Sequence, residues 1–385
     1  MTKILVVDDE EDVELLIRQK FAKQLKSKEF QFIFASNGVE ALKTLFKDQD
    51  INIILTDINM PEMDGLTLIS HLPELKRIFK AIIISAYGDM SNIRKAMNNG
   101  ACDFITKPID FEDLEITISN AIEQYTSLKK ALEVENRLSD IEKELQVAYT
   151  IQQSIIPHQF EPFPNNYNFA ILGKMIPAKE VGGDFFDFFR LDEKHLGFII
   201  ADVSGKSVSA ALFMAMTRAI IRTTSLQADS PSDCLTKSNT ILCVNNDSCM
   251  FVTAFYGILN IETGEIACAN AGHNPPFILR ASNKVEEIAR NEGIPLGVAD
   301  DTLYSTHLIQ LKKEDCLVLY TDGITEAMNA KKELYTEKRF LESLTNANSR
   351  TLAEFSERIL QDVQNFVDGA PSADDITFLC IKQLI

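Results

Sequence analysis

The stretch INIILTDINMPEMDG, residues 51–65, joins an apolar run to an aspartate and then to a turn that contains Pro and Gly. An apolar run of this length is typical of a strand buried on both faces of a parallel sheet. Four similar runs lie in the same part of the chain, at residues 4–7, 30–35, 81–85 and 102–106, with amphipathic helical periods between them. Residues 1–122 are therefore predicted to form a doubly wound α/β domain around a five-stranded parallel sheet.

Acidic residues follow two of these strands. Asp8 and Asp9 come after the first run, and Asp57 comes after the third. Because the carboxyl ends of parallel strands share one crevice, these carboxylates are expected to meet and to bind a hard cation such as Mg²⁺. Ser85 and Lys107 end the fourth and fifth strands, where they could hold the oxygens of a phosphoryl group on Asp57.

The motifs around these positions resemble those of the response-regulator receiver family. They are VVDDEED (6–12), LTDINMPEMDG (55–65), ISAYGD (84–89) and DFITKP (103–108). The resemblance implies phosphorylation by a histidine kinase. It assigns roles to the phosphoacceptor Asp57, the metal ligands Asp8, Asp9, Asp57 and Asn59 (through its carbonyl), the phosphate contacts Ser85 and Lys107, and the switch aromatic Phe104.

Residues 112–156 contain neither Gly nor Pro and predict one long helix that ends before Pro157. Eight residues, all apolar except Gln152, recur in it at alternating spacings of three and four: Ala131, Val134, Leu138, Ile141, Leu145, Ala148, Gln152 and Ile155. This heptad seam predicts a parallel homodimer through a linker, residues 123–156, although the polar Gln152 weakens the seam. The alternative is a helix that packs back on its own domain.

Residues 157–385 read as an α+β domain, because strand-like runs rich in Phe and Ile are interrupted by amphipathic stretches. Expected strands lie at 251–260, 265–270, 316–320 and 376–382, and expected helices at 207–225, 231–245, 337–345 and 351–367.

Four acids in this half stand beside apolar strand residues. Asp184 follows two glycines, Asp202 follows residues 198–201, Asp322 follows residues 317–320, and Asp374 precedes the last strand. A buried carboxylate needs a partner, yet few basic residues lie nearby in the sequence. A shared pair of divalent cations supplies that partner. Such a pair can also acidify a water and clamp a phosphoryl group.

The order of motifs here resembles the PPM phosphatases, in the bacterial branch of 2C-type enzymes active in stress response and sporulation. The motifs are VGGDFFD (181–187), ADVSGKS (201–207), AGHNPP (271–276), LYTDGITEA (319–327) and DDITF (374–378). The resemblance implies a β-sandwich flanked by helices, with Mn²⁺ or Mg²⁺, two ions, between the sheets. The implied ligands are Asp184, Asp202, Asp322, Asp374 and the carbonyl of Val203 or a neighbour. Asp375 is the alternative to Asp374, because many relatives carry Asn there, and Asp374 is favoured.

Three residues near these motifs have open roles. Ser207 stands where relatives usually have Gly. Lys206 is a candidate phosphate contact by position alone. His273, in AGHNPP, is either a general acid or a residue that organises a turn through hydrogen bonds.

The combined reading is a response regulator in which phosphorylation of Asp57 controls a protein serine/threonine phosphatase. The implied substrate is a phosphoserine or phosphothreonine protein, such as an anti-sigma factor antagonist. Residues 145–157 resemble the helix that couples upstream sensors to the catalytic core in this branch, and a simple spacer is the alternative. The main rival is a catalytically inert module in which the receiver controls binding or sequestration of a partner.

Composition argues against other classes. With 56 acidic and 38 basic residues, the net charge of −18 disfavours nucleic acid and anionic membranes, and no basic recognition helix supports a DNA-binding regulator. The seven cysteines show no CxxC pair, and no apolar run approaches spanning length. The chain is expected to be cytoplasmic, with reduced thiols.

Overall fold

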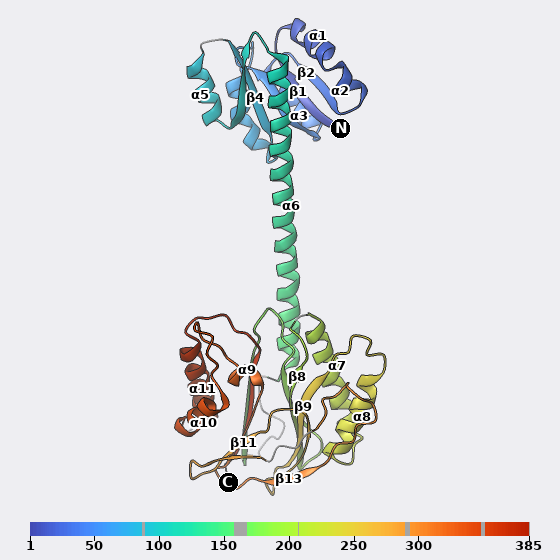
Figure 1. Cartoon of the computed structure of the whole chain (residues 1–385), viewed down its shortest axis with the longest axis vertical. Helices are drawn as coiled ribbons and strands as arrows, with labels where there is room; N and C mark the ends of the chain where they lie inside the picture. Colours follow the sequence, from blue (N-terminus) through green and yellow to red (C-terminus); the bar gives the residue numbers. More distant parts are fainter. Residues whose placement is uncertain (87–88, 158–167, 207, 289–292, 348–350, 385) are drawn as a thin grey trace. The chain divides into compact units, whose positions relative to one another are not determined.

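Figure 1 shows the computed structural model of the chain, which describes residues 1–86, 89–157, 168–206, 208–288, 293–347 and 351–384. The chain divides into two compact units, Met1–Ile141 and Glu142–Ile385. Each unit has its own buried apolar core, and the two are described in turn.

The first unit contains the five-stranded parallel sheet expected from the sequence. Its strand order is β2-β1-β3-β4-β5, and every neighbouring pair is parallel. The strands are β1 (Thr2–Val7), β2 (Phe30–Ala35), β3 (Ile51–Asp57), β4 (Lys80–Ala86) and β5 (Ala101–Lys107). The predicted doubly wound fold is confirmed, with strand ends shifted by two residues at most.

Helices cover both faces of this sheet: α1 (Glu11–Lys20), α2 (Ala22–Lys26), α3 (Gly38–Lys47), α4 (Gly65–His71), the 3-10 helix η1 (Leu72–Leu75), α5 (Met90–Asn98) and the start of α6 (Phe111–Ile155). Successive side chains of β1 serve opposite faces, as strand geometry requires. Val6 packs in the cluster that contains α1 and α6, whereas Val7 packs in the cluster that contains α3 and α4. The apolar runs in the sequence follow from this double burial.

The helix α6 is 45 residues long, close to the predicted span. Its first turns bury Leu114 and Ile118 in the first unit. Farther along, the seam residues Val134, Leu138 and Ile141 are 59%, 56% and 46% exposed, so they do not pack back on the receiver sheet. None of the helices in the described part of the chain combines the length and the hydropathy needed to cross a membrane.

The second unit is built on two antiparallel sheets. One has the order β13-β10-β9-β8-β7 and the other β12-β11-β14-β15-β6. The strands are β6 (Phe169–Ile176), β7 (Phe185–Arg190), β8 (His195–Val203), β9 (Val252–Asn260), β10 (Glu265–Ala271), β11 (Phe277–Leu279), β12 (Val285–Glu287), β13 (His307–Gln310), β14 (Cys316–Tyr320) and β15 (Ile376–Gln383). The helices are α7 (Val208–Ser225), α8 (Pro231–Cys243), α9 (Asp322–Thr325), α10 (Glu337–Asn346) and α11 (Leu352–Val367).

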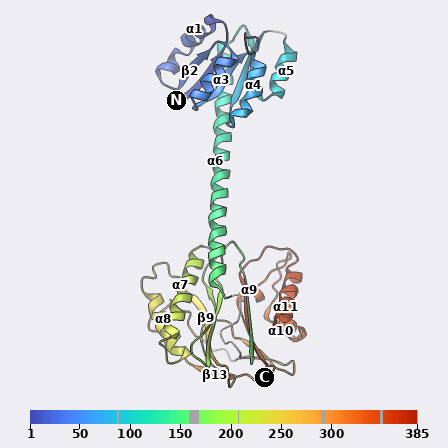
Figure 2. The same cartoon turned by 180° about the vertical axis from the view of Figure 1, so that it is seen from behind.

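The two sheets pack face to face and form a β-sandwich. Phe198 of β8 and Leu319 of β14 belong to the same central core. The next residue on each strand faces outward: Ile199 packs in the core with α7 and α8, and Tyr320 packs in the core with α10 and α11. Figures 1 and 2 show these two helix pairs on opposite outer sides of the sandwich. The predicted α+β sandwich flanked by helices is therefore confirmed.

Candidate functional site

The carboxyl ends of β1 and β3 bring three acids of the first unit together. Asp8, Asp9 and Asp57 each offer a carboxylate oxygen, and these atoms all lie within 4.8 Å of one another. Lys107, at the end of β5, donates to Asp57 Oδ2 at 2.6 Å and lies 3.3 Å from Asp8 Oδ2. One lysine therefore neutralises part of the charge of this trio from within the crevice.

The surroundings of Asp57 hold its carboxylate in place. Its Oδ1 accepts hydrogen bonds from the backbone N–H groups of Ile58 at 2.6 Å and Asn59 at 3.4 Å. The register pairs Asp57 with Ile84, so Ser85 is the next residue on the adjacent strand. The Ser85 hydroxyl is buried and has no hydrogen-bond partner among the described residues, whereas Phe104 on β5 is 37% exposed.

The donor set of this crevice fits a hard cation. Asp8 Oδ2 is buried and accepts no hydrogen bond within the described residues. Burial raises the pKa of Asp8, and the charge of Asp57 adds to that effect, against a backbone hydrogen bond and Lys107. Oxygen ligands that repel one another are the kind that Mg²⁺ binds, so the residues fit the expected ion.

The second unit gathers four acids from different elements. Asp184 precedes β7, Asp202 lies near the end of β8, Asp322 opens α9 directly after β14, and Asp374 precedes β15. The sequence placed Asp202 after a strand, but the structure extends β8 through it to Val203.

The pKa shifts of these acids show that they converge. Burial raises the pKa of Asp184 well above its usual range, and the charge of Asp202 raises it further. Burial and then the charge of Asp322 raise the pKa of Asp202 to about 7. The pKa of Asp322 is raised by burial and then by Asp374. Each acid is thus close enough to raise the pKa of the next one, and further positive charge is needed to balance the set.

This second cluster is wider than the first. Across the described residues, only the trio around Asp57 forms a group of three or more acidic, His or Cys side chains with ligand atoms all within 4.8 Å. Of the four acids of the sandwich, only Asp184 is deeply buried: it is 2% exposed, and its Oδ2 accepts a hydrogen bond from the Thr321 hydroxyl at 2.6 Å. Asp202, Asp322 and Asp374 are partly buried.

Adjacent aspartates at the start of β15 have different surroundings. The carboxylate of Asp375 accepts backbone N–H bonds from Ala178 and Gly183 at 2.7 Å and from Asp184 at 3.3 Å. Asp375 therefore shapes the loop that carries Asp184. Asp374 instead faces Lys206, whose Nζ lies 2.7 Å from its Oδ2.

The same loop runs close to the end of β8. A Cβ atom built on Gly183 would lie 2.9 Å from the carbonyl oxygen of Val203, which is closer than real side chains approach. Only glycine allows this approach, which brings the Val203 carbonyl beside the residue that precedes Asp184.

Two family descriptions match the chain. "Response regulator receiver domain" matches residues 4–119, and "Stage II sporulation protein E (SpoIIE)" matches residues 192–383. The chain is a receiver-linked member of the SpoIIE phosphatase family. The family assignment covers both of the compact units and agrees with the resemblances found in the sequence.

Individual relatives match part of the chain. Protein IcfG of Synechocystis sp. is 29% identical over 265 residues, covering 62% of this chain and 41% of IcfG. Phosphoserine phosphatase RsbU of Bacillus subtilis is 30% identical over 203 residues, covering 53% of this chain and 57% of RsbU. The chain thus spans about half the length of these curated relatives. The SiaA PP2C domain of Pseudomonas aeruginosa has a TM-score of 0.56 at 21% identity, over 64% of this chain and 98% of that chain, and so shows the shared fold.

His273 of this family member is engaged at both ring nitrogens. Nδ1 lies 2.9 Å from the Thr253 hydroxyl, and Nε2 lies 3.1 Å from the Tyr320 carbonyl. A carbonyl can only accept, so Nε2 carries the proton and Nδ1 accepts from Thr253. Burial lowers the pKa of His273 to about 4. The geometry favours a residue that organises a turn through hydrogen bonds over a general acid.

Ser207, which stands where relatives usually have Gly, lies outside the described residues.

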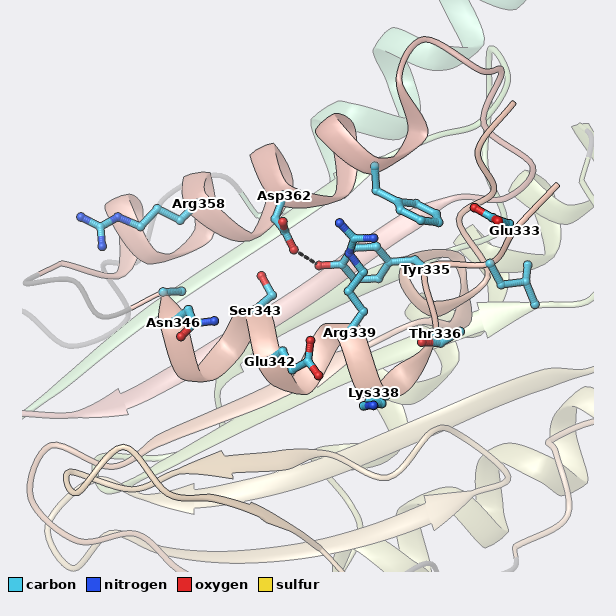
Figure 3. Close-up of a pocket in the computed structure, with 13 residues that line it drawn as sticks. Glu333, Tyr335, Thr336, Lys338, Arg339, Glu342, Ser343, Asn346, Arg358 and Asp362 are labelled. Atoms are coloured by element: carbon cyan, nitrogen blue, oxygen red, sulfur yellow. Dashed lines mark hydrogen bonds between the residues drawn. The ribbon is translucent and has the colours of Figure 1, made fainter. Parts of the chain in front are cut away.

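One cavity lies apart from the acids. It measures about 650 Å³ and lies along α10 and α11, where Figure 3 shows Arg339 beside Tyr335 and the Tyr335 hydroxyl bonded to Asp362. None of the four acids lines it. A smaller cavity of about 500 Å³ does include Asp322, together with His273 and Glu326.

Sequence reasoning missed the role of Gln152. Its side chain is 4% exposed, donates to the carbonyl of Gly182 at 2.7 Å and accepts from the N–H of Gly182 at 3.1 Å. The last turn of α6 therefore holds the loop that precedes Asp184. The available signal was a polar residue at an apolar seam position, which indicates a specific polar partner.

Proposed function

We propose that the second unit hydrolyses phosphoserine or phosphothreonine on a partner protein. The observation that carries this proposal is the convergence of Asp184, Asp202 and Asp322, each with a pKa raised by burial and by the next acid. The resemblance to RsbU, whose name is phosphoserine phosphatase, supports the same substrate class.

The proposed metal ligands are Asp184, Asp202, Asp322, Asp374 and the carbonyl of Val203. Two Mn²⁺ or Mg²⁺ ions held there would supply an acidified water and a clamp for the phosphoryl group. Asp374 is the better candidate of the adjacent pair, because three backbone N–H groups already occupy the carboxylate of Asp375. Thr321 orients Asp184 through its hydroxyl.

For the first unit, the proposal is that a histidine kinase phosphorylates Asp57. Asp8, Asp9, Asp57 and the Asn59 carbonyl would hold Mg²⁺, since the first three already lie within 4.8 Å of one another. The unpartnered hydroxyl of Ser85 and the ammonium of Lys107 are the groups available to the phosphoryl oxygens. The exposed ring of Phe104 would change its packing with the state of Asp57.

The proposed connection between the units is the linker, residues 123–156, between a receiver domain at 1–122 and a phosphatase domain at 157–385. Exposed seam residues such as Val134 and Leu138 suit a homodimer, since pairing would bury them. A shift of that helix would reach the catalytic loop through the two hydrogen bonds between Gln152 and Gly182.

The proposed substrate is a small phosphorylated signalling protein of the anti-sigma factor antagonist type. The chemistry needed is a phosphomonoester on a flexible segment that can enter the cavity beside Asp322. A cytoplasmic setting fits the seven free cysteines, all of which are thiols in the structure.

A direct assay tests both parts of this proposal. The full chain with Mn²⁺ should release phosphate from a phosphoserine protein, and a phosphoryl mimic loaded on Asp57 should change the rate. Asp57→Asn is the matched control, because it keeps the catalytic acids but removes the acceptor. An unchanged rate after loading would exclude the control model, and no turnover in either state would favour the inert, partner-sequestering module.

A further inference from the structure

One lysine lies at the rim of the catalytic acids with no role in the proposed metal chemistry. Lys206 stands in the segment between β8 and α7. Its Nζ lies 2.7 Å from Asp374 Oδ2 and donates to the carbonyl of Ala373 at 2.7 Å. The Lys206 side chain is nevertheless 42% exposed, so these two contacts do not enclose it.

The charge of Lys206 is secured by its neighbours. Its ammonium forms an ion pair with Asp374 and a hydrogen bond with the Ala373 carbonyl. Among the residues that the structure describes, no other lysine or arginine forms an ion pair with Asp184, Asp202, Asp322 or Asp374. The acid cluster therefore has a single fixed cation of its own.

A phosphomonoester needs positive groups in order to bind beside these acids. Its nonbridging oxygens carry nearly two negative charges, which four carboxylates repel. Positive groups aimed at those oxygens are the main protein contribution to phosphoryl transfer. An ammonium has three N–H donors, and two of those of Lys206 are directed at Asp374 and Ala373. One donor is left for a ligand.

We propose that Lys206 binds a nonbridging oxygen of the substrate phosphoryl group, with Asp374 and the Ala373 carbonyl orienting its ammonium. The inference rests on the proposed phosphatase function for the identity of the natural ligand. It assigns to this chain a phosphate-binding residue that comes from the loop after Asp202.

The competing explanation is purely structural. Lys206 could simply tie its loop to the segment before β15 through Asp374 and Ala373. That role would make its loss lower the stability of the fold and the affinity for metal, with no separate effect on phosphate.

A neighbouring lysine offers a matched control. The Lys179 ammonium lies 3.5 Å from the carbonyl of Lys206 and forms no ion pair with the acids of this cluster within the described residues. Lys179→Gln removes the same charge from nearly the same place without touching Asp374.

The test uses the full chain saturated with Mn²⁺ and titrated with inorganic phosphate by calorimetry. Lys206→Gln should weaken phosphate binding by about 10- to 100-fold, the effect of losing one charge-assisted hydrogen bond. Lys206→Arg should restore most of the affinity, and Lys179→Gln should change it by less than about threefold. The affinity for Mn²⁺ should be equal or higher in Lys206→Gln, because the variant removes a competitor for Asp374.

Wild-type phosphate affinity in Lys206→Gln would overturn the inference, as would a wild-type chain that binds Mn²⁺ but no phosphate. A parallel loss of Mn²⁺ affinity and melting temperature, with no further loss of phosphate, would assign Lys206 the structural role instead. Hydrolysis is measured separately. If phosphate binds through Lys206 but phosphoserine protein is not hydrolysed, the inference stands and the proposed function fails.

Discussion

The two acid clusters of this chain differ in how the repulsion between their carboxylates is balanced. In the first unit, Lys107 reaches into the crevice and contacts both Asp8 and Asp57. In the second unit, Lys206 contacts only the outermost acid, Asp374, and Asp184 is left 2% exposed with its pKa raised.

The difference indicates what each cluster requires to work. A cluster with an internal lysine is expected to tolerate the absence of metal, as the proposed cycling of Asp57 between phosphorylated and free states would require. A cluster of buried and partly buried acids without an internal lysine is expected to depend on bound cations, as the proposed metal-assisted hydrolysis would require. The following experiments test this contrast, beginning with the largest expected effect.

Removal of one acid from the second cluster should abolish most phosphatase turnover, whereas removal of one from the first cluster should not. Asp202→Ala or Asp322→Ala is expected to lower phosphatase turnover by about 1000-fold or more, because losing a ligand forfeits several kcal/mol of transition-state stabilisation. The measurement is phosphate release from a phosphoserine protein in Mn²⁺, with circular dichroism as the check of folding. Asp57→Asn should keep the basal rate within about threefold, since Asp57 belongs to the other unit. Turnover that survives both alanine variants would contradict the metal mechanism.

The buried His273 should make stability depend on pH. Burial lowers its pKa from 6.5 to about 4, so the unfolded chain binds a proton before the folded chain does. Stability should therefore fall as pH drops from about 6.5 to about 4, by about 3 kcal/mol for this group. Denaturant unfolding of wild type and His273→Gln across this range measures the difference.

The comparison with His273→Gln is needed because the raised acids titrate in the same range with the opposite sign. They are present in both proteins and cancel in the difference. An equal pH dependence in the two proteins would show that His273 is not held neutral in the fold.

Loss of Gln152 should loosen the loop that carries Asp184, because Gln152 holds Gly182 of that loop by two hydrogen bonds. Gln152→Ala leaves the N–H and carbonyl of Gly182 without their partners, which should cost about 2 kcal/mol of stability. It should also abolish the response of phosphatase activity to a phosphoryl mimic on Asp57. Gln153→Ala is the neighbouring control. A variant that unfolds like wild type and still responds to the mimic would exclude Gln152 as the connection.

The smallest effect is expected in the receiver crevice. Lys107→Met removes the internal cation and should lower the stability of the metal-free first unit by about 1 kcal/mol, because the pair is partly exposed. Mg²⁺ should then bind more tightly than in wild type, since it no longer competes with the ammonium. Tryptophan is absent from the chain, so calorimetry is the suitable measurement. Weaker Mg²⁺ binding in the variant would contradict the contrast between the clusters.

Much of this architecture could be predicted from the sequence. The runs that became β1, β3 and β4 are mostly buried, and such strands can be recognised in a sequence because nearly every residue is apolar. The short strands β11, β12 and β13 and the single turn of α9 were missed, because three or four residues carry too little periodicity to be recognised. The eight-residue strand β6 was also missed, since Gly173 and Lys174 interrupt its apolar run. The acids were found because carboxylates beside apolar runs are costly unless a site uses them.

The roles of individual side chains also divide into those that the sequence predicted and those that only the tertiary structure decided. The order and chemistry of the acidic motifs are properties of the sequence, since residue type and spacing along a strand set which groups reach a common edge. The partners of Asp375, Gln152 and His273 were decided only by the tertiary structure. Each makes its hydrogen bonds with residues distant in the chain, such as Asp375 with Gly183. Hydrogen bonds are short and directional, so only the folded arrangement determines which polar groups meet.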